Sequence, residues 1–160
     1  MGYSVKRLFI KTILPIIIGI VVGVIARETL LTKATVVGDS MQPTMYDGDM
    51  CLVNRVGGLK RGDIVVVKQE EDYIIKRLVG LPHDTIQIID GKLFVNDNYV
   101  EENYIKDSGS GEEGYLGERF ILGTNDYFVL GDNRANSKDS RYIGPIQKEE
   151  ILGYVIGGNN

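Results

Sequence analysis

The 160-residue chain is poor in the residues on which several kinds of site depend. It has one cysteine, Cys51, and one histidine, His83. A single cysteine excludes an internal disulfide framework and a zinc site built from several cysteines, and a single histidine excludes a metal site with two histidine ligands. A catalytic triad of serine, histidine and aspartate would have to use His83. No residue pattern indicates a metal or an organic cofactor, so we expect none.

Basic residues are scarce over most of the sequence. Residues 1–26 contain Lys6, Arg7 and Lys11 and no acidic residue, whereas residues 27–160 hold 15 basic and 22 acidic side chains, a net charge of −7. Nucleic-acid binding needs a basic face that neutralises phosphate. The acidic body therefore argues against nucleic acid as a partner.

An uncharged hydrophobic run occupies Ile13–Ala26. Extended back to Leu8, it would form a helix of about 28 Å, close to the hydrocarbon thickness of about 30 Å in a bilayer. All three basic residues precede the run, which predicts a cytoplasmic N-terminus. We therefore expect a cytoplasmic stub and a transmembrane anchor in residues 1–26, and an extracytoplasmic β-rich domain in residues 27–160.

Two other interpretations of this run stay open. A basic start, an apolar stretch and the small-residue ending Val24-Ile25-Ala26 also describe a cleavable secretory signal. A buried core helix is the third possibility. Both membrane interpretations export the body, and a lone cysteine suits an exported protein that does not rely on disulfides.

The remaining sequence alternates short apolar runs with turn residues, which predicts a mainly β body. Asp90-Gly91 between two apolar runs is a strong hairpin signal. The segment Lys106–Glu118 is rich in glycine, serine and acidic residues and predicts a surface loop. The expected strands are residues 50–53, 63–68, 73–80, 85–89, 92–95, 127–130 and 151–156. Their spacing favours a barrel or two packed sheets over βαβ units.

Three segments contain residues that carry chemistry. Residues 38–49 and 131–141 combine glycine, aspartate and serine, although each by itself also fits an ordinary polar turn. The third segment is the expected strand 73–80, in which alternation places Lys76 between aliphatic neighbours on one face. Such a lysine is desolvated, and lowering its pKa from about 10.4 to near neutrality costs about 4 kcal/mol. The alternative is a solvent-facing Lys76 beside Arg77, which cannot act as a base because guanidinium does not deprotonate in proteins.

Taken together and in this order, the segments resemble the bacterial type I signal peptidases, serine proteases of the membrane surface that use a Ser–Lys dyad. The resemblance covers nearly the whole chain, after the apolar N-terminal run. The matching motifs are Gly38-Asp39-Ser40-Met41-x-Pro43-Thr44, Arg61-Gly62-Asp63-Ile64-Val65, Lys76-Arg77-x-x-Gly80-x-Pro82-x-Asp84 and Gly131-Asp132-Asn133-Arg134 through Asp139-Ser140-Arg141.

The resemblance implies a role for several residues. Ser40 would be the nucleophile, and Lys76, as a neutral amine, would accept its proton and later serve the leaving group. This Ser–Lys arrangement needs no histidine. The backbone N–H of Ser40 would be one oxyanion donor. The supporting residues would be Ser137, whose hydroxyl orients the lysine, Asp139 and Arg141, a charged pair that shapes the site, and Asp132, which begins the same segment.

Two positions depart from the family pattern. Gly38 stands where the Gram-negative branch has a serine that donates to the oxyanion, so the chain resembles the Gram-positive branch and the second donor is open. His83 replaces a glycine, and it is the less comfortable residue if that turn needs a positive φ. We interpret His83 as a surface turn residue and Cys51 as a small core residue. The body is too short for the large inserted β-domain of the Gram-negative enzymes.

The expected function is that of a membrane-anchored serine endopeptidase that removes N-terminal signal peptides from exported preproteins. The substrate would bind as an extended strand, with small side chains such as alanine at the first and third residues before the cut. Lipid is the second expected partner, because thirteen residues separate Ala26 from Ser40. Met41 and Met45 would contact the lipid surface or line the substrate pockets, with ordinary core packing as the alternative.

Two further functions are compatible with the same motifs. One is a self-cleaving Ser–Lys protease of the repressor type, which the export segment and the lack of a DNA-binding helical domain disfavour. The other is a non-catalytic, membrane-tethered binding module of the same fold. The presence of Ser40, Lys76 and Ser137 together argues against this module.

Overall fold

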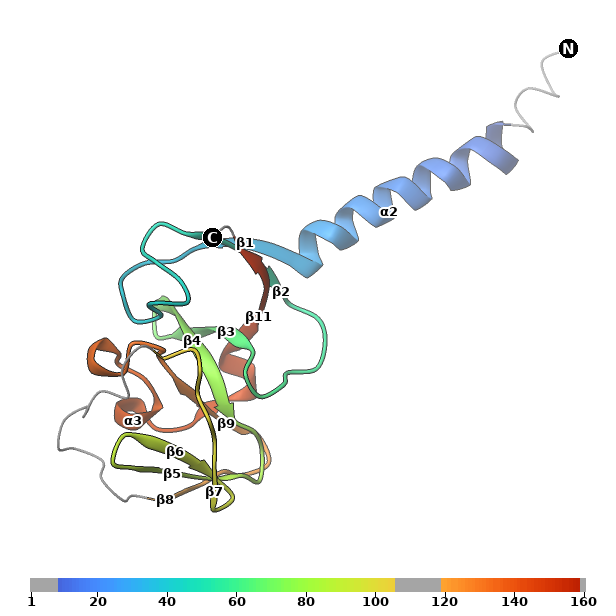
Figure 1. Cartoon of the computed structure of the whole chain (residues 1–160). Helices are drawn as coiled ribbons and strands as arrows, with labels where there is room; N and C mark the ends of the chain where they lie inside the picture. The colour runs from blue at the N-terminus through green and yellow to red at the C-terminus, as the bar shows by residue number, and fades with distance from the viewer. Residues whose placement is uncertain (1–8, 106–118, 159–160) are drawn as a thin grey trace, which may run out of the picture.

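The computed structural model describes residues 9–105 and 119–158. A short π-helix, η1 (Phe9–Ile13), leads into the helix α2 (Leu14–Leu30), which extends away from the β-rich body (Figure 1). The apolar run is thus helical as expected, but the helix continues to Leu30 rather than ending at Ala26. Within the described ranges, no helix is both long and apolar enough to cross a membrane. The predicted transmembrane span therefore stays a prediction.

The body consists of two antiparallel sheets, as the predicted mainly β fold requires. The larger sheet has the strand order β1-β2-β11-β3-β4-β9-β10, and the smaller has the order β7-β6-β5-β8. The strands of the larger sheet are β1 (Leu31–Thr35), β2 (Met50–Asn54), β3 (Ile64–Gln69), β4 (Asp72–Gly80), β9 (Asp126–Leu130), β10 (Ile146–Gln147) and β11 (Ile151–Gly158). Those of the smaller sheet are β5 (Thr85–Ile89), β6 (Lys92–Val95), β7 (Asn98–Tyr99) and β8 (Arg119–Ile121). The short helices are η2 (Arg134–Asn136), α3 (Ser140–Ile143) and η3 (Lys148–Glu150).

All seven expected strands are present within a few residues of their predicted bounds. The Asp90-Gly91 hairpin is confirmed: Ile89 pairs with Lys92, and both turn residues have positive φ angles of 50° and 74°. Two successive positive φ angles match the twist of the flanking strands. The expected loop 106–118 lies outside the described residues.

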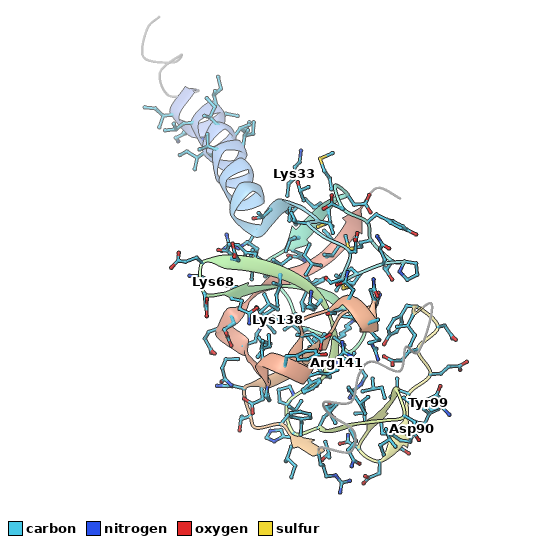
Figure 2. All side chains as sticks on the ribbon, turned by 90° about the vertical axis from the view of Figure 1, so that its left-hand side faces the viewer. Lys33, Lys68, Asp90, Tyr99, Lys138 and Arg141 are labelled. Carbon is cyan, nitrogen blue, oxygen red and sulfur yellow. The ribbon has the colours of Figure 1, made fainter. Side chains whose placement is uncertain are left out.

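The two sheets lie at different distances from the helix (Figures 1 and 2). Lys33, on β1, lies near the point where α2 meets the body, whereas Asp90 and Tyr99 belong to the smaller sheet at the opposite end of the molecule. A buried cluster that includes Val79, Leu93 and Phe128 joins residues of both sheets. Each such side chain contributes about 1.5–3 kcal/mol when it is fully buried.

Strand β4 passes from the larger sheet toward the smaller one at Gly80. A Cβ atom there would lie 2.7 Å from the Cβ of Phe128 and 2.8 Å from Leu122 Cδ1, so only glycine allows this approach. In the turn that follows, His83 is exposed and has a φ of 69°. The turn therefore uses the backbone conformation that favours glycine, and His83 is a surface turn residue as predicted.

A second buried cluster lies beneath residues 36–45 and holds Cys51, Val53 and Val66. Cys51 is a core residue, as predicted, and burial raises the pKa of its thiol. Met41 and Met45 belong to the same cluster, with only 1% and 7% of their surfaces exposed. Their side chains therefore pack in the core, and their expected contact with the lipid surface or with substrate stays a prediction.

Candidate active site

Ser40 lies in a loop that is closed at its base by backbone hydrogen bonds. Val36 N–H donates to Asp49 O at 2.8 Å, and Gly48 N–H donates to Val36 O at 2.9 Å. Gly38 has a φ of 83°, and its N–H donates to Asp47 Oδ1 at 2.7 Å. The loop is thus fixed from within, and its two buried methionines attach it to the core.

Lys76 reaches Ser40 from strand β4. Its side chain is buried, with 3% of the residue exposed, and Nζ lies 2.7 Å from Ser40 Oγ. Nζ also donates to Ile75 O at 2.9 Å. The structure therefore brings together the two residues that the resemblance assigns to the dyad, although 36 positions separate them in the sequence.

Two opposing effects determine the pKa of Lys76. Burial disfavours the ammonium form and lowers the pKa, while the negative charges of Asp139 and Asp132 raise it. Burial is the larger effect, so the pKa is below the usual value for lysine. A buried amine with a lowered pKa reaches its neutral, proton-accepting form at a lower pH than an exposed lysine does.

Asp132 is one of the two buried carboxylates that act on the pKa of Lys76. Arg77 binds it with two hydrogen bonds, from Nε to Oδ1 at 2.8 Å and from Nη2 to Oδ2 at 2.6 Å. The hydroxyl of Thr44, in the Ser40 loop, donates to Asp132 Oδ2 at 2.5 Å. Asp132 therefore joins the strand that carries Lys76 to the loop that carries Ser40.

Asp139, the second carboxylate, has no exposed surface. It accepts hydrogen bonds from Arg141 Nε at 2.8 Å and from Gly131 N–H at 2.9 Å. The Ser137 hydroxyl donates to Asp139 Oδ2 at 2.7 Å, whereas the two hydrogen bonds of Lys76 go to Ser40 and Ile75. Asp139 and Arg141 thus form the expected pair, and Ser137 lies beside the carboxylate that acts on the lysine. Its expected role in orienting Lys76 stays a prediction.

Gly131 is the point of closest approach between the two loops. A Cβ atom on it would lie 2.2 Å from Ser137 Oγ and 2.6 Å from the carbonyl oxygen of Ser40. The next residues tie the loops together, since Asn133 N–H donates to Ser40 O at 3.0 Å and Asn133 Nδ2 donates to Asp39 O at 3.1 Å. The position of the Ser40 backbone therefore depends on a glycine at residue 131.

Several contributors to the site have no separate signal in the sequence. Thr44 and Asn133 lie inside the motifs, but nothing in a single sequence assigns them their partners. Glu102 and Tyr104 lie outside every motif, between the expected strand 92–95 and the expected loop 106–118, and sequence reasoning missed them. Tyr104 contacts Arg77, the neighbour of Lys76, and Glu102 pairs with Arg134 in the segment 131–141. Only the folded chain reveals these contacts.

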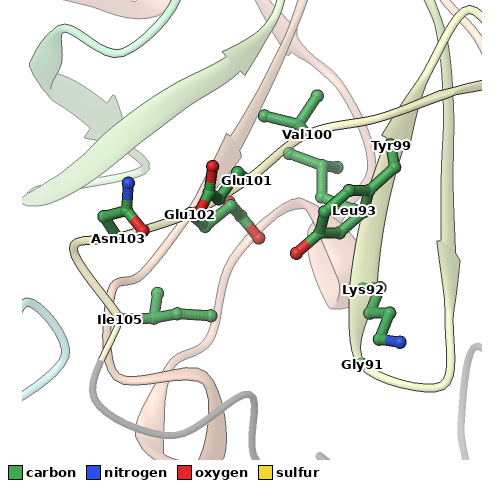
Figure 3. A pocket seen from close by; sticks show the side chains of 9 residues that line it. All are labelled: Gly91, Lys92, Leu93, Tyr99, Val100, Glu101, Glu102, Asn103 and Ile105. Carbon is green, nitrogen blue, oxygen red and sulfur yellow. The ribbon is translucent and has the colours of Figure 1, made fainter.

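Among the described residues, the metal-ligating groups and a cavity can be compared with the Ser40–Lys76 pair. In this part of the chain, no three histidine, cysteine, aspartate or glutamate side chains are grouped as a metal site requires. A cavity of about 270 Å³ lies between strands β6 and β7 and residues 100–105 (Figure 3). Glu102 lines this cavity, but neither Ser40 nor Lys76 does.

The geometry around Ser40 fits nucleophilic catalysis. A serine hydroxyl within hydrogen-bond distance of a base, which is in turn held by its surroundings, is the arrangement that activates a weak nucleophile. At Ser40 the neighbouring group is the desolvated amine of Lys76, and buried ion pairs lie in the segments on both sides of it.

Comparison with known proteins gives matches over most of the chain. The profile of the family described as signal peptidase, peptidase S26, matches residues 9–156. Signal peptidase I of Bacillus amyloliquefaciens is 38% identical over 149 residues, which cover 86% of this chain and 80% of the relative. Signal peptidase IB of Staphylococcus aureus is 32% identical over 170 residues, which cover 94% of this chain and 88% of the relative.

A solved structure is also similar. The crystal structure of a signal peptidase I from Enterococcus faecalis is 27% identical, has a TM-score of 0.51, and covers 62% of this chain and 97% of its own. The family profile and relatives of this identity extend over nearly the whole sequence, and we conclude that the chain belongs to the signal peptidase I family of serine endopeptidases.

Proposed function

We propose that the chain is a membrane-anchored serine endopeptidase that removes N-terminal signal peptides from exported preproteins, with Ser40 as nucleophile and Lys76 as general base. One observation carries this assignment: the buried Nζ of Lys76 lies 2.7 Å from Ser40 Oγ. A lysine held in this way accepts the hydroxyl proton without help from a histidine.

The reaction follows from this pair. Ser40 Oγ attacks the scissile carbonyl carbon as its proton passes to Lys76 Nζ, and a C–O bond forms. The resulting ammonium gives the proton to the leaving amine as the C–N bond breaks. Water then hydrolyses the acyl-enzyme: Lys76 takes a proton from the water, and the proton returns to Ser40. The backbone N–H of Ser40 is the first oxyanion donor.

The second oxyanion donor is not Gly38 in the conformation described, because its N–H is engaged by Asp47. Ser137, Asp139, Arg141 and Asp132 support the pair. The hydrogen bonds of Asp132 to Thr44 and Arg77 hold the segment 131–141 against the Ser40 loop and strand β4. Asp139 braces that segment from within through Gly131 N–H and Arg141. Loss of an oxyanion donor or of a supporting contact raises the barrier, since stabilisation of developing charge depends on fixed geometry.

The proposal includes a location and a substrate class. The apolar run over residues 13–26, with all three basic residues on its N-terminal side, supports a single-pass anchor in residues 1–26, a cytoplasmic N-terminus and a catalytic domain in residues 27–160 on the extracytoplasmic face. Anchoring would place Ser40 close to lipid, where a translocated preprotein presents its cleavage site. Small residues before the cut are the expected specificity.

Cleavage of a test preprotein whose signal ends in Ala-x-Ala, in detergent with lipid, tests the proposal. We expect product from the wild type and none above background from Ser40→Ala or Lys76→Ala. Lys68→Ala is the matched control, because Lys68 is an exposed lysine on the neighbouring strand β3, and it should cut at the wild-type rate.

Three results would contradict parts of this assignment. Undiminished cutting by Lys76→Ala would show that the base is assigned wrongly. No cutting by folded wild type would favour the tethered binding module. A membrane-purified chain whose N-terminus begins after Ala26 would show that the apolar run is a cleaved signal rather than an anchor.

A further inference from the structure

Tyr104 contacts the residue that follows the lysine of the dyad. Its ring lies under the guanidinium of Arg77, with the Arg77 Cζ atom 4.0 Å from the ring centroid. A guanidinium stacked on an aromatic face at this distance is held by a cation–π attraction, which is strongest where water is excluded. Tyr104 is half-buried and Arg77 is buried. The stack therefore has the environment in which it is most effective.

The other contacts of Arg77 explain why its position matters. Nε and Nη2 hold Asp132, and Nη1 donates to Gly62 O at 2.8 Å. The polar edge of the guanidinium is thus bound by oxygens, and the Tyr104 ring covers one face. Asp132 in turn accepts the Thr44 hydroxyl from the Ser40 loop. A shift of Arg77 would therefore displace Lys76, its neighbour on β4, and, through Asp132 and Thr44, the loop that carries Ser40.

A second connection runs from the Tyr104 hydroxyl. This hydroxyl donates to Glu102 Oε1, which also accepts a hydrogen bond from Arg134 Nη2 at 2.5 Å. Glu102 and Arg134 are buried, with 9% and 5% of their surfaces exposed, and Arg134 Nε donates to Gly131 O at 3.0 Å. Figure 3 shows Glu102 on the wall of the cavity formed by residues 100–105 and the β6–β7 hairpin. The segment 100–105 is thereby attached to the segment that holds Asp132.

We propose that Tyr104 is a positioning residue for the Ser40–Lys76 pair, whose ring holds Arg77 against Asp132 while its hydroxyl is tied to Arg134 through Glu102. This inference rests on the proposed function, because it assumes that Ser40 and Lys76 carry out the chemistry. Tyr104 itself touches neither reacting atom, and it acts through Arg77.

Loss of the Tyr104 ring should also change the pKa of Lys76, through the charged groups that surround it. On the segment 131–141, Asp139 is paired with Arg141, and Arg134 is paired with Glu102 of the segment 100–105. Asp132 is paired with Arg77, the neighbour of Lys76 on β4. The negative charge of Asp132 raises the pKa of Lys76. The guanidinium of Arg77, bound to that carboxylate, carries the opposite charge and weakens this effect. When the ring is lost and Arg77 moves away from Asp132, the pKa of Lys76 rises toward its ordinary value.

The test compares Tyr104→Leu with Tyr104→Phe in full-length protein, using the Ala-x-Ala preprotein across a pH series. For Tyr104→Leu we expect kcat to fall roughly ten- to hundredfold, because a displacement near 1 Å at a reacting pair has effects of this size. KM should stay within about twofold, because no substrate contact is removed, and the activity limb that rises with pH should move to higher pH. Tyr104→Phe keeps the stack and should retain kcat within about threefold.

The control is Tyr99→Leu, which removes an exposed tyrosine from the wall of the neighbouring cavity and should match the wild type. If circular dichroism shows that Tyr104→Leu does not fold, Tyr104→Met gives the same comparison with a longer, flexible apolar side chain.

Two outcomes would overturn the inference. One is a folded Tyr104→Leu or Tyr104→Met enzyme with wild-type kcat and an unmoved pH limb. The other is a Tyr104→Phe enzyme that loses as much kcat as Tyr104→Leu, because the hydroxyl rather than the ring would then be responsible. Lys76→Ala, measured alongside, distinguishes failure of the proposed dyad from failure of the positioning role of Tyr104. An active Lys76→Ala enzyme refutes the dyad itself, whereas an inactive one with a normal Tyr104→Leu enzyme refutes only the positioning role.

Discussion

Replacing Gly131 by alanine should damage the site by pushing two loops apart. The new Cβ would lie 2.6 Å from the carbonyl oxygen of Ser40 and 2.5 Å from Ser137 Cβ, whereas ordinary contacts begin near 3.4 Å. Relief therefore needs a displacement of about 0.8 Å at Ser40 and about 0.9 Å at Ser137. Because the nearest atoms include backbone, a side-chain rotation cannot supply it. Inserting one methyl group into a packed region of this kind costs about 1–3 kcal/mol.

The displacement would act directly on the dyad. The distance from Lys76 Nζ to Ser40 Oγ is 2.7 Å, and a shift of about 0.8 Å away from Lys76 would lengthen it to about 3.5 Å, beyond an ordinary hydrogen bond. We expect kcat for preprotein cleavage to fall roughly ten- to hundredfold. The free energy of unfolding, measured by urea denaturation, should fall by about 1–3 kcal/mol.

Gly58→Ala is the matched control for this experiment. A Cβ at residue 58 would meet no atom within 4 Å, and its backbone does not lie in the region reserved for glycine. It should leave both kcat and stability close to those of the wild type. A Gly131→Ala enzyme with full activity and unchanged stability would refute the argument that glycine at residue 131 sets the position of Ser40.

Two further predictions concern ionisation and backbone strain. Because the pKa of Lys76 is lowered in the folded state, the unfolded chain binds more protons between that pKa and the ordinary value of 10.5, so stability should rise with pH through this window. Urea denaturation across the window should show this rise for the wild type and not for Lys76→Met, and equal pH slopes for the two proteins would contradict it. His83→Gly should stabilise the fold by about 1 kcal/mol, because His83 has a φ of 69° that glycine adopts without strain. Cleavage activity should not change, and an unchanged or lower urea midpoint would show that the turn is unstrained.

The sequence determined much of the local structure of this protein. Short apolar, β-branched runs bounded by turn signals predicted strands such as β3 and β6. A strand of four residues or more is long enough for its pattern of buried and exposed side chains to be read directly along the sequence. Asp90-Gly91 predicted its hairpin for the same reason, since the turn needs only its own backbone conformation. The strands β7 and β10 contain two residues each, which is too short to show a pattern, and they exist because a neighbouring strand offers hydrogen-bonding partners.

The candidate site was predictable only in part. The motifs and their order, through a family resemblance, singled out Ser40 and Lys76, but no pattern gives the 2.7 Å contact between residues 36 positions apart. Met41 and Met45 show the same limit, since an apolar side chain in a loop fits a core or an exposed surface equally well until the packing of the loop is known.

Only the tertiary structure decided which buried charges share partners. It placed Tyr104 on Arg77 and Glu102 on Arg134, because burial leaves charged and polar groups no solvent to bind and each must find its partner across the fold. Sequence alone thus supplied the chemical groups and their local structure. Their mutual distances, and with them the ionisation of Lys76, came from the packing of strand β4 against the Ser40 loop and the segments 100–105 and 131–141.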